Sequence, residues 1–235
     1  MLSIYKKELR SYFTSVIGYV FLVLYLALGG AIFCYTTLFS MSADVTPYFT
    51  YMLLLSGIIL PLLTMKSFAE EKKIKTEQLL LTAPISLASM VLGKFLAAYT
   101  MFGGCMIFNS LYFLILNHYA VLKFAILFGN LFAILLVGFV FISIGLFVSA
   151  LTENQLAAAV GTIGIILAFL LVGLISALLP SSYMLRYVFD FLSVFSRFQG
   201  FTNGYFDFAS IIYYISVGAI FLYLTVRIYD RKRYG

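Results

Sequence analysis

Six apolar runs, each long enough to cross a lipid bilayer, constrain this chain more than any other feature of its sequence. A spanning helix needs about 20 mostly apolar residues. The predicted spans are residues 17–39, 48–65, 88–116, 120–150, 155–179 and 208–229. The runs are continuously apolar and lack the alternation of a barrel strand, so helices are the spanning elements. We therefore predict an all-α, polytopic membrane protein with six transmembrane helices in a single domain, residues 1–235.

The composition of the chain and the polar residues between the runs support these spans. Hydrophobic residues make up 63% of the chain and charged residues only 10%, whereas a soluble domain carries about 25% charged residues. Polar or turn-forming residues separate the runs, as Asp44 and Pro47 do for the first two and residues 152–154 do for the fourth and fifth. Pro61 lies inside the second run, where it is expected to kink the helix or to end its regular part.

The basic residues orient the spans. With the N-terminus inside, twelve of the fifteen basic residues lie on the inner side: Lys6, Lys7, Arg10, Lys66, Lys72, Lys73, Lys75, Lys94, Arg227, Arg231, Lys232 and Arg233. This bias predicts that both termini are cytoplasmic. Lys94 begins inside the third run and is expected to snorkel to the cytoplasmic surface. Topology and anionic lipid explain the net charge of +6, so we predict no nucleic-acid partner.

Residues 1–16 mix apolar side chains with the basic Lys6, Lys7 and Arg10. This mixture is typical of a short helix that lies in the membrane interface. A frayed tail whose charges only set the topology is the alternative.

The charged segment 66–82 is the only long charged island between apolar runs. It contains no glycine or proline, and Glu71 with Lys75 has the favourable i,i+4 spacing of a helical ion pair; Lys73 with Glu77 has the reverse order. We therefore predict a charged cytoplasmic helix.

Three leucines, residues 79–81, follow this helix, and residues 82–84 then break it. Ser86 is placed to cap the next helix. Apolar side chains surrounded by charge suggest contact with a soluble protein partner. A helix that merely rests on lipid headgroups is the alternative.

Several chemistries find no support in the sequence. Gly93 and Lys94 do not complete a P-loop, because the earlier glycine is missing and Phe95 follows the lysine, so any ATPase must be another polypeptide. No ionisable residue lies near the centre of a span, which argues against an ion-coupled transporter. No catalytic or metal-binding set is evident, which argues against an enzyme. The polar residues within the spans are expected to form hydrogen bonds between helices, with the lining of a substrate route as the alternative: Thr100, Asn109, Tyr112, Asn130 and Ser143.

A resemblance is carried by the order Phe68, Glu70-Glu71-Lys72, Thr76-Glu77, Leu79-Leu80, Thr82-Ala83-Pro84-Ile85-Ser86 and Gly93-Lys94. This order resembles the first cytoplasmic loop of ABC-2 type transporter permeases. Weaker similarities are found in Leu151-Thr152-Glu153-Asn154-Gln155 and in the stretch from Phe195 through Gly204 to Asp230-Arg231-Lys232-Arg233. Together they are most similar to the gliding-motility and nitrous-oxide-accessory branch of that family.

The resemblance implies an ABC-2, type V exporter-like transmembrane domain in the cell membrane of a prokaryote. Residues 66–86 would form the coupling-helix loop, residues 180–207 an extracytoplasmic re-entrant segment, and residues 1–16 the interfacial helix. Two copies of a separate ATP-binding subunit would bind ATP and magnesium, and this chain would bind no cofactor. The implied coupling residues are Phe68, Glu70, Glu71, Lys72, Thr76, Glu77, Leu79, Leu80 and Glu153.

The resemblance also implies that a second permease, identical or related, pairs with this chain. Ala157, Gly161 and Gly164 form a small-residue face on the fifth span, which would serve either this pairing or packing within the chain. The function predicted is a permease subunit of an ABC-2 exporter. A membrane scaffold through which ATP hydrolysis performs mechanical or signalling work is the alternative, followed by a secondary transporter or channel.

Overall fold

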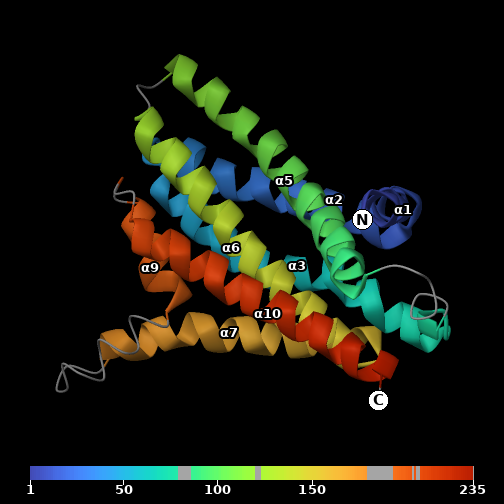
Figure 1. Ribbon diagram of the computed structural model, residues 1–235. Helices are drawn as coiled ribbons and strands as arrows, with labels where there is room; N and C mark the ends of the chain where they lie inside the picture. The colour runs from blue at the N-terminus through green and yellow to red at the C-terminus, as the bar shows by residue number, and fades with distance from the viewer. Residues whose placement is uncertain (79–85, 120–122, 179–192, 203, 205–206, 235) are drawn as a thin grey trace.

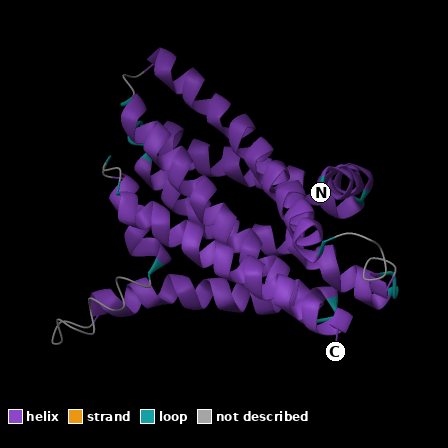
Figure 2. Cartoon of the chain, viewed as in Figure 1, coloured by secondary structure: helices purple, strands orange, loops and turns teal. Residues whose placement is uncertain are grey.

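The computed structural model describes residues 1–78, 86–119, 123–178, 193–202, 204 and 207–234. The regular structure of these residues is entirely helical (Figure 2). Six helices are long and apolar enough to span a membrane: Val16–Phe39, Thr46–Lys73, Leu87–His118, Phe124–Leu151, Gln155–Gly173 and Phe208–Arg233. The predicted all-α fold with six spans is confirmed. The second span, however, continues to Lys73, well past the predicted end at residue 65.

The described helices follow one another along the chain as α1 (Leu2–Thr14), α2 (Val16–Phe33), the π-helix η1 (Cys34–Phe39), α3 (Thr46–Lys73), α5 (Leu87–Tyr119), α6 (Phe124–Leu151), α7 (Gln155–Leu178), α9 (Val194–Thr202) and α10 (Phe208–Tyr234). Figure 1 shows their arrangement.

Helix α6 lies at the centre of the bundle, where α3 and α10 pack along it (Figure 1). It is also the most apolar span, with a mean hydropathy of 2.9. Small residues bring its neighbours close. A Cβ atom at Gly138 would lie 2.1 Å from the Phe102 ring, and one at Gly145 would lie 2.1 Å from the hydroxyl of Thr64. In lipid, such close packing replaces the hydrophobic driving force that holds helices together in water.

Helix α1 runs across the direction of the spans and is seen end on in Figure 1. Ser15 breaks the chain between α1 and α2 with an extended backbone and caps α2 by accepting a hydrogen bond from the Gly18 amide at 3.3 Å. A Cβ atom at Gly18 would lie 2.0 Å from the carbonyl oxygen of Tyr12, so this corner requires glycine. The orientation of α1 suits an interfacial helix, and its place in the membrane stays a prediction.

The predicted boundaries hold at several points. The Ser86 hydroxyl caps α5 by accepting from the Ser89 amide at 3.3 Å, as expected. The Asp44 carboxylate accepts from the Thr46 amide at 3.0 Å just before α3 begins. Pro61 does not end the second span, since α3 continues through it to Lys73.

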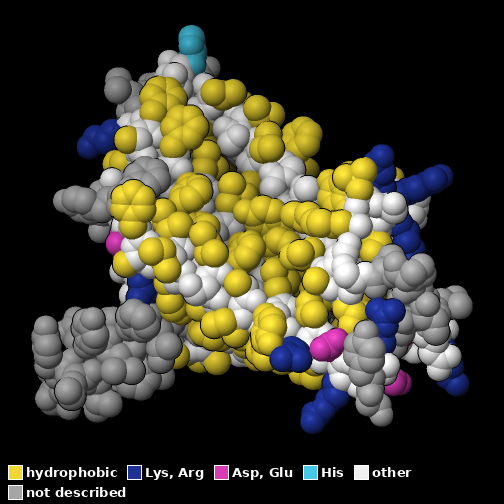
Figure 3. Space-filling view, viewed as in Figure 1, with side chains coloured by type: hydrophobic (Ala, Val, Ile, Leu, Met, Phe, Trp, Pro, Cys, Tyr) yellow, Lys and Arg dark blue, Asp and Glu magenta, His cyan; other side chains and the backbone are white. Residues whose placement is uncertain are grey.

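Both termini lie at the same end of the bundle as the end of α3 (Figure 1). Apolar side chains cover the middle of the visible face, whereas most of the visible charged side chains gather at that end (Figure 3). This distribution agrees with the orientation derived from the basic residues. The predicted re-entrant segment, residues 180–207, contains the described helix α9. Residues 180–192 of this segment lie outside the described residues.

Candidate functional site

The cytoplasmic end of α3 is the candidate site, and we refer to residues 66–77 as the junction. Helix α3 carries its charged residues as a continuation of the span, which corrects the prediction of a separate helix over 66–82. The helix ends at Lys73, and Lys75 turns the chain with a φ of 58°. The Glu71–Lys75 pair predicted from the spacing is replaced, because Glu71 pairs with Lys94 of α5. Within the junction, Lys66 and Glu70 form a pair at helical spacing, at 3.2 Å.

Lys94 is buried beneath the junction, so the prediction that it snorkels to the surface is wrong. Its side chain is 1% exposed. The ammonium nitrogen lies 2.9 Å from Oε1 of Glu71 and 3.1 Å from Oε1 of Glu8. It also donates to the backbone carbonyl of Ser67 at 2.8 Å and lies 5.0 Å from the centre of the Phe68 ring. Carboxylates from α1 and α3 thus compensate the buried charge, which removes the need for water.

Helix α6 holds the junction from another side. The buried Ser149 hydroxyl accepts hydrogen bonds from the amides of Phe68 and Ala69, each at 3.1 Å, and donates to the carbonyl of Met65, also at 3.1 Å. The Lys72 ammonium donates to the carbonyl of Ala150, in the last turn of α6. A cation at a helix C-terminus is stabilised by the helix dipole. The end of α3 is therefore fastened to the end of α6 by both backbone and side chain.

Helix α10 contacts the junction through two pairs. The buried Phe68 ring packs on Tyr229, with 5.0 Å between ring centres. The Lys232 ammonium lies 2.7 Å from the Glu77 carboxylate. The junction is therefore bonded to α1, α5, α6 and α10, and any displacement of residues 66–77 acts on all four helices.

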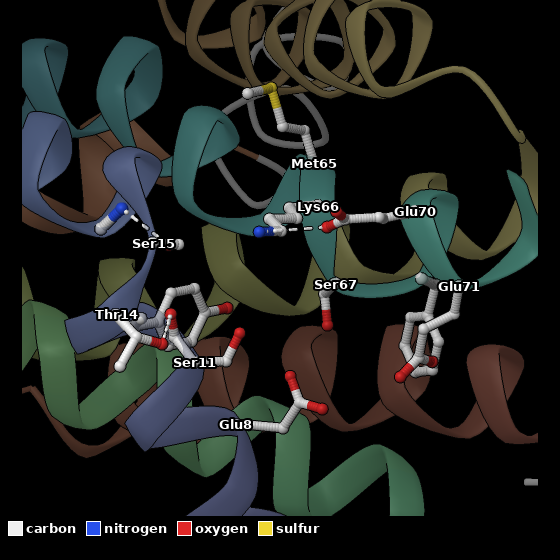
Figure 4. A network of polar contacts seen from close by, with 12 residues as sticks. Glu8, Ser11, Thr14, Ser15, Met65, Lys66, Ser67, Glu70 and Glu71 are labelled. Atoms are coloured by element: carbon white, nitrogen blue, oxygen red, sulfur yellow. Dashed lines mark hydrogen bonds and ion pairs between the residues drawn. The ribbon is translucent and has the colours of Figure 1, made fainter. Parts of the chain in front are cut away.

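A cavity of about 390 Å³ opens between α1 and the junction. Its lining includes Glu8, Ser67, Glu70 and Lys94. The Ser67 hydroxyl is buried and has no hydrogen-bond partner within the described part of the chain. Figure 4 shows Glu8 of α1 and Ser67 of α3 pointing toward one another across this space.

The basic residues of α1 divide between solvent and this cavity. Lys6 and Arg10 are exposed. Lys7 is also largely exposed, yet its ammonium lies 3.8 Å from the Glu71 carboxylate. The Tyr12 hydroxyl donates to the carbonyl of Leu63 at 3.4 Å. Burial, with a smaller effect of the Glu8 charge, raises the pKa of Tyr12 above its ordinary value, so that this hydroxyl keeps its proton.

The residues expected to contact an ATPase therefore differ in how far their side chains are exposed to a partner protein. Phe68, Glu71 and Lys72 point inward and hold the bundle together. Glu77 is mostly covered by Lys232, and the Thr76 hydroxyl donates to the carbonyl of Glu71 at 3.4 Å. Glu70 is half-buried beside Lys66, and Glu153 is exposed in the turn between α6 and α7. Leu79 and Leu80 lie outside the described residues. Coupling through these residues stays a prediction.

Three residues of other helices hold the junction in place and were not recognised from the sequence: Glu8, Ser149 and, as a buried cation, Lys94. A lone lysine inside an apolar run is a signal that a partner carboxylate exists. Nothing in the sequence tells which of the inner acids supplies it, because Glu8 is far from Lys94 along the chain.

The polar residues within the spans bond within their own helices more than was predicted. Thr100, Asn130 and Ser143 donate to carbonyls three or four residues earlier in their own helices, which corrects the predicted interhelical bonds. Such local bonds satisfy a side chain in lipid without a partner helix. Asn109 lies against Gly29 of α2, and its amide has no hydrogen-bond partner within the described part of the chain.

The small-residue face of α7 is only partly used for packing within the chain. A Cβ atom at Gly161 would lie 3.1 Å from Val148 of α6, whereas one at Gly164 would meet nothing within 4 Å. Ala157 is exposed on the same helix.

Six candidate spanning helices, with both ends of the chain at one end of the bundle and a charged junction there, define a multi-pass membrane protein. Comparison with protein families matches residues 33–232, most of the chain, to the ABC-2 family transporter proteins, and the chain belongs to this family. It is therefore the permease subunit of an ABC transporter, and ATP is hydrolysed by a separate ATP-binding subunit. A comparison with curated proteins finds no match for the chain.

Proposed function

We propose that the junction is the surface through which the ATP-binding subunit drives this permease. The observation that carries the proposal is that residues 66–77 contact four helices at once: α1 through Lys7, α5 through Lys94, α6 through Ser149, and α10 through Tyr229 and Lys232. A push on the exposed turn that ends α3 then moves the spans as rigid bodies. Ile74, 60% exposed in that turn, offers an apolar contact beside the basic Lys73 and Lys75.

Two ATP-binding subunits and two permeases are proposed to form the complete transporter. The open side of α7 around Gly164 supports pairing between permeases. Close helix packing in lipid uses small residues, and a Cβ atom at Gly164 would meet nothing within 4 Å among the described residues. The resemblance of the cytoplasmic loop supports a place in the gliding-motility and nitrous-oxide-accessory branch, export as the direction of transport, and the cell membrane of a prokaryote as the location.

Ile74→Asp tests the proposed surface. The tagged full chain is purified gently from its native host, and the recovered ATP-binding subunit is quantified by mass spectrometry. We expect Ile74→Asp to lose most of the ATP-binding subunit, because the new charge must be desolvated at the contact. Met41→Asp is the matched control, since Met41 is an exposed apolar residue in a turn at the other end of α3. Full recovery with Ile74→Asp would contradict the junction as the contact surface.

A further inference from the structure

Lys94 is one buried cation held between two carboxylates that belong to different helices. Glu71 comes from α3 and Glu8 from α1, and their distances from the ammonium nitrogen differ by only 0.2 Å (2.9 and 3.1 Å). A single carboxylate would suffice to neutralise one lysine. The second carboxylate therefore has a consequence beyond charge compensation: it ties α1 to α5 and, through Lys94, to the end of α3.

The two carboxylates are not equivalent, because their helices are held differently. Glu71 lies next to Lys72, which donates to the end of α6, and two residues beyond Ala69, whose amide donates to Ser149. Glu8 lies on α1, a short helix that packs on α5 and α2 at the edge of the bundle. Besides the bonds of Lys94, two long polar contacts join α1 to α3: Lys7 with Glu71 at 3.8 Å and Tyr12 with Leu63 at 3.4 Å.

We propose that Lys94 is a positioning residue with one permanent and one releasable partner: Glu71 stays bound to it, and Glu8 leaves it when α1 moves away from α3. Which force moves α1 rests on the function proposed above, in which the ATP-binding subunit acts on the junction. The arrangement lets α1 separate from the bundle without leaving a buried charge alone.

The charges and the cavity favour this release. A buried lysine without a partner is strongly unfavourable, so a pair with a single carboxylate would resist opening. Here Glu71 and the Ser67 carbonyl keep Lys94 compensated after Glu8 has gone. The departing carboxylate keeps a cation on its own helix, because the Lys7 ammonium lies 4.0 Å from Oε1 of Glu8. The cavity of about 390 Å³ already separates α1 from the junction, so little direct packing between α1 and α3 has to be broken.

The test measures the distance between α1 and the end of α3 in the full chain in lipid nanodiscs. Spin labels are placed at Lys6→Cys and Lys73→Cys, two exposed positions, after Cys34 and Cys105 are replaced by alanine. We expect one narrow distance distribution in this background. Glu8→Gln is expected to shift it to longer distances, and Lys94→Met to shift it likewise, whereas Lys94→Arg retains the narrow distribution because the positive charge is kept.

Glu70→Gln is the matched control, because Glu70 lies beside Glu71 but pairs with Lys66 instead of Lys94. It is expected to leave the distribution unchanged. Glu71→Gln is expected to keep α1 in place through Glu8 while lowering the thermal stability more than Glu8→Gln does. An unchanged distribution in Glu8→Gln, or a Lys94→Met variant that folds and keeps the narrow distribution, overturns the proposal.

The same labels in the complex test release during the transport cycle. Vanadate trapping of the bound ATP-binding subunit is expected to shift the wild-type distribution toward that of Glu8→Gln. A trapped complex without this shift overturns the release of Glu8. If no ATP-binding subunit binds the wild-type chain, the proposed coupling surface fails, while the comparison of Glu8→Gln with Glu70→Gln in the isolated chain still decides the role of Lys94.

Discussion

Ser149 offers the sharpest test of how the spans are joined at the cytoplasmic side. Its hydroxyl contacts the Met65 carbonyl and the Ala69 amide, which are hydrogen-bond partners of one another in a regular helix, and it also accepts from the amide of Phe68. A side chain from α6 thus contacts both members of one backbone hydrogen-bonding pair of α3, where it can compete with the bond between them. Insertion of a side chain into such a pair is a recognised cause of local helix opening.

The expected cost of Ser149→Ala follows from these three contacts. Each backbone group left without a partner in a buried position costs about 1–3 kcal/mol. Relaxation of α3 restores part of this, since the Ala69 amide can return to the Met65 carbonyl. Measured interhelical hydrogen bonds in membranes contribute about 0.6 kcal/mol on average and up to about 1.7. We therefore expect Ser149→Ala to lower the free energy of unfolding by about 1–2 kcal/mol.

Ser143→Ala is the matched control for this prediction. Ser143 lies on the same helix and is equally buried, but its hydroxyl donates only to the Phe139 carbonyl of its own helix, at 2.7 Å. Because that carbonyl also belongs to the backbone ladder, its loss is expected to cost less than about 0.5 kcal/mol. Reversible unfolding in mixed micelles with increasing sodium dodecyl sulfate measures both variants. Equal stability of the two would show that α3 closes its own ladder and that Ser149 does not hold the junction.

Two further predictions concern packing and capping. Gly145→Ala is expected to destabilise the chain by about 1–3 kcal/mol in the same unfolding assay, because the new Cβ would lie 2.1 Å from the hydroxyl of the buried Thr64. Gly104→Ala is the control: a Cβ atom there meets open space, so the substitution is expected to be neutral or stabilising. Asp207 begins α10, and hydrogen bonds from the Ser210 hydroxyl and from backbone amides lower its pKa below the ordinary value. Asp207→Ala should lower the free energy of unfolding by about 1 kcal/mol near neutral pH. The difference in stability between this variant and the unchanged chain should shrink as the pH falls below about 3.9 toward the lowered pKa, because the carboxylate becomes protonated. Asp207→Asn does not titrate, so its side chain should still cap α10 in acid.

The number of spans could be predicted because lipid imposes a simple rule on sequence: a span must be long and apolar, so the apolar runs were sufficient. The cytoplasmic location of the basic end stays a prediction. The end of the second span could not be predicted in this way. Charged residues 66–73 were expected to belong to a separate helix outside the span, yet they continue α3, because Lys94 and Ser149 supply partners from other helices.

The position of Lys94 was predicted wrongly for the same reason: its partners come from other helices. Snorkelling assumes that the nearest water is the cheapest partner for a buried ammonium group. That assumption fails here because α1 folds back across the inner side and brings Glu8 to within 3.1 Å, which a local reading of the sequence cannot foresee. Gly93 beside Lys94 favours this close approach of α1, since a Cβ atom there would lie 3.0 Å from the side chain of Ile4 in α1.

The position of these polar contacts also bears on how a permease can be driven. Around the middle of the bundle, Ser143 and Thr162 donate to carbonyls of their own helices, and the polar contacts between spans are single neutral hydrogen bonds, such as that between the hydroxyls of Tyr25 and Ser56 at 2.8 Å. At the cytoplasmic end, by contrast, Lys72, Lys94 and Ser149 join different helices by directional bonds. Such directional bonds would pass a displacement of the proposed coupling surface on to several helices, which is the mechanical requirement of the proposed function.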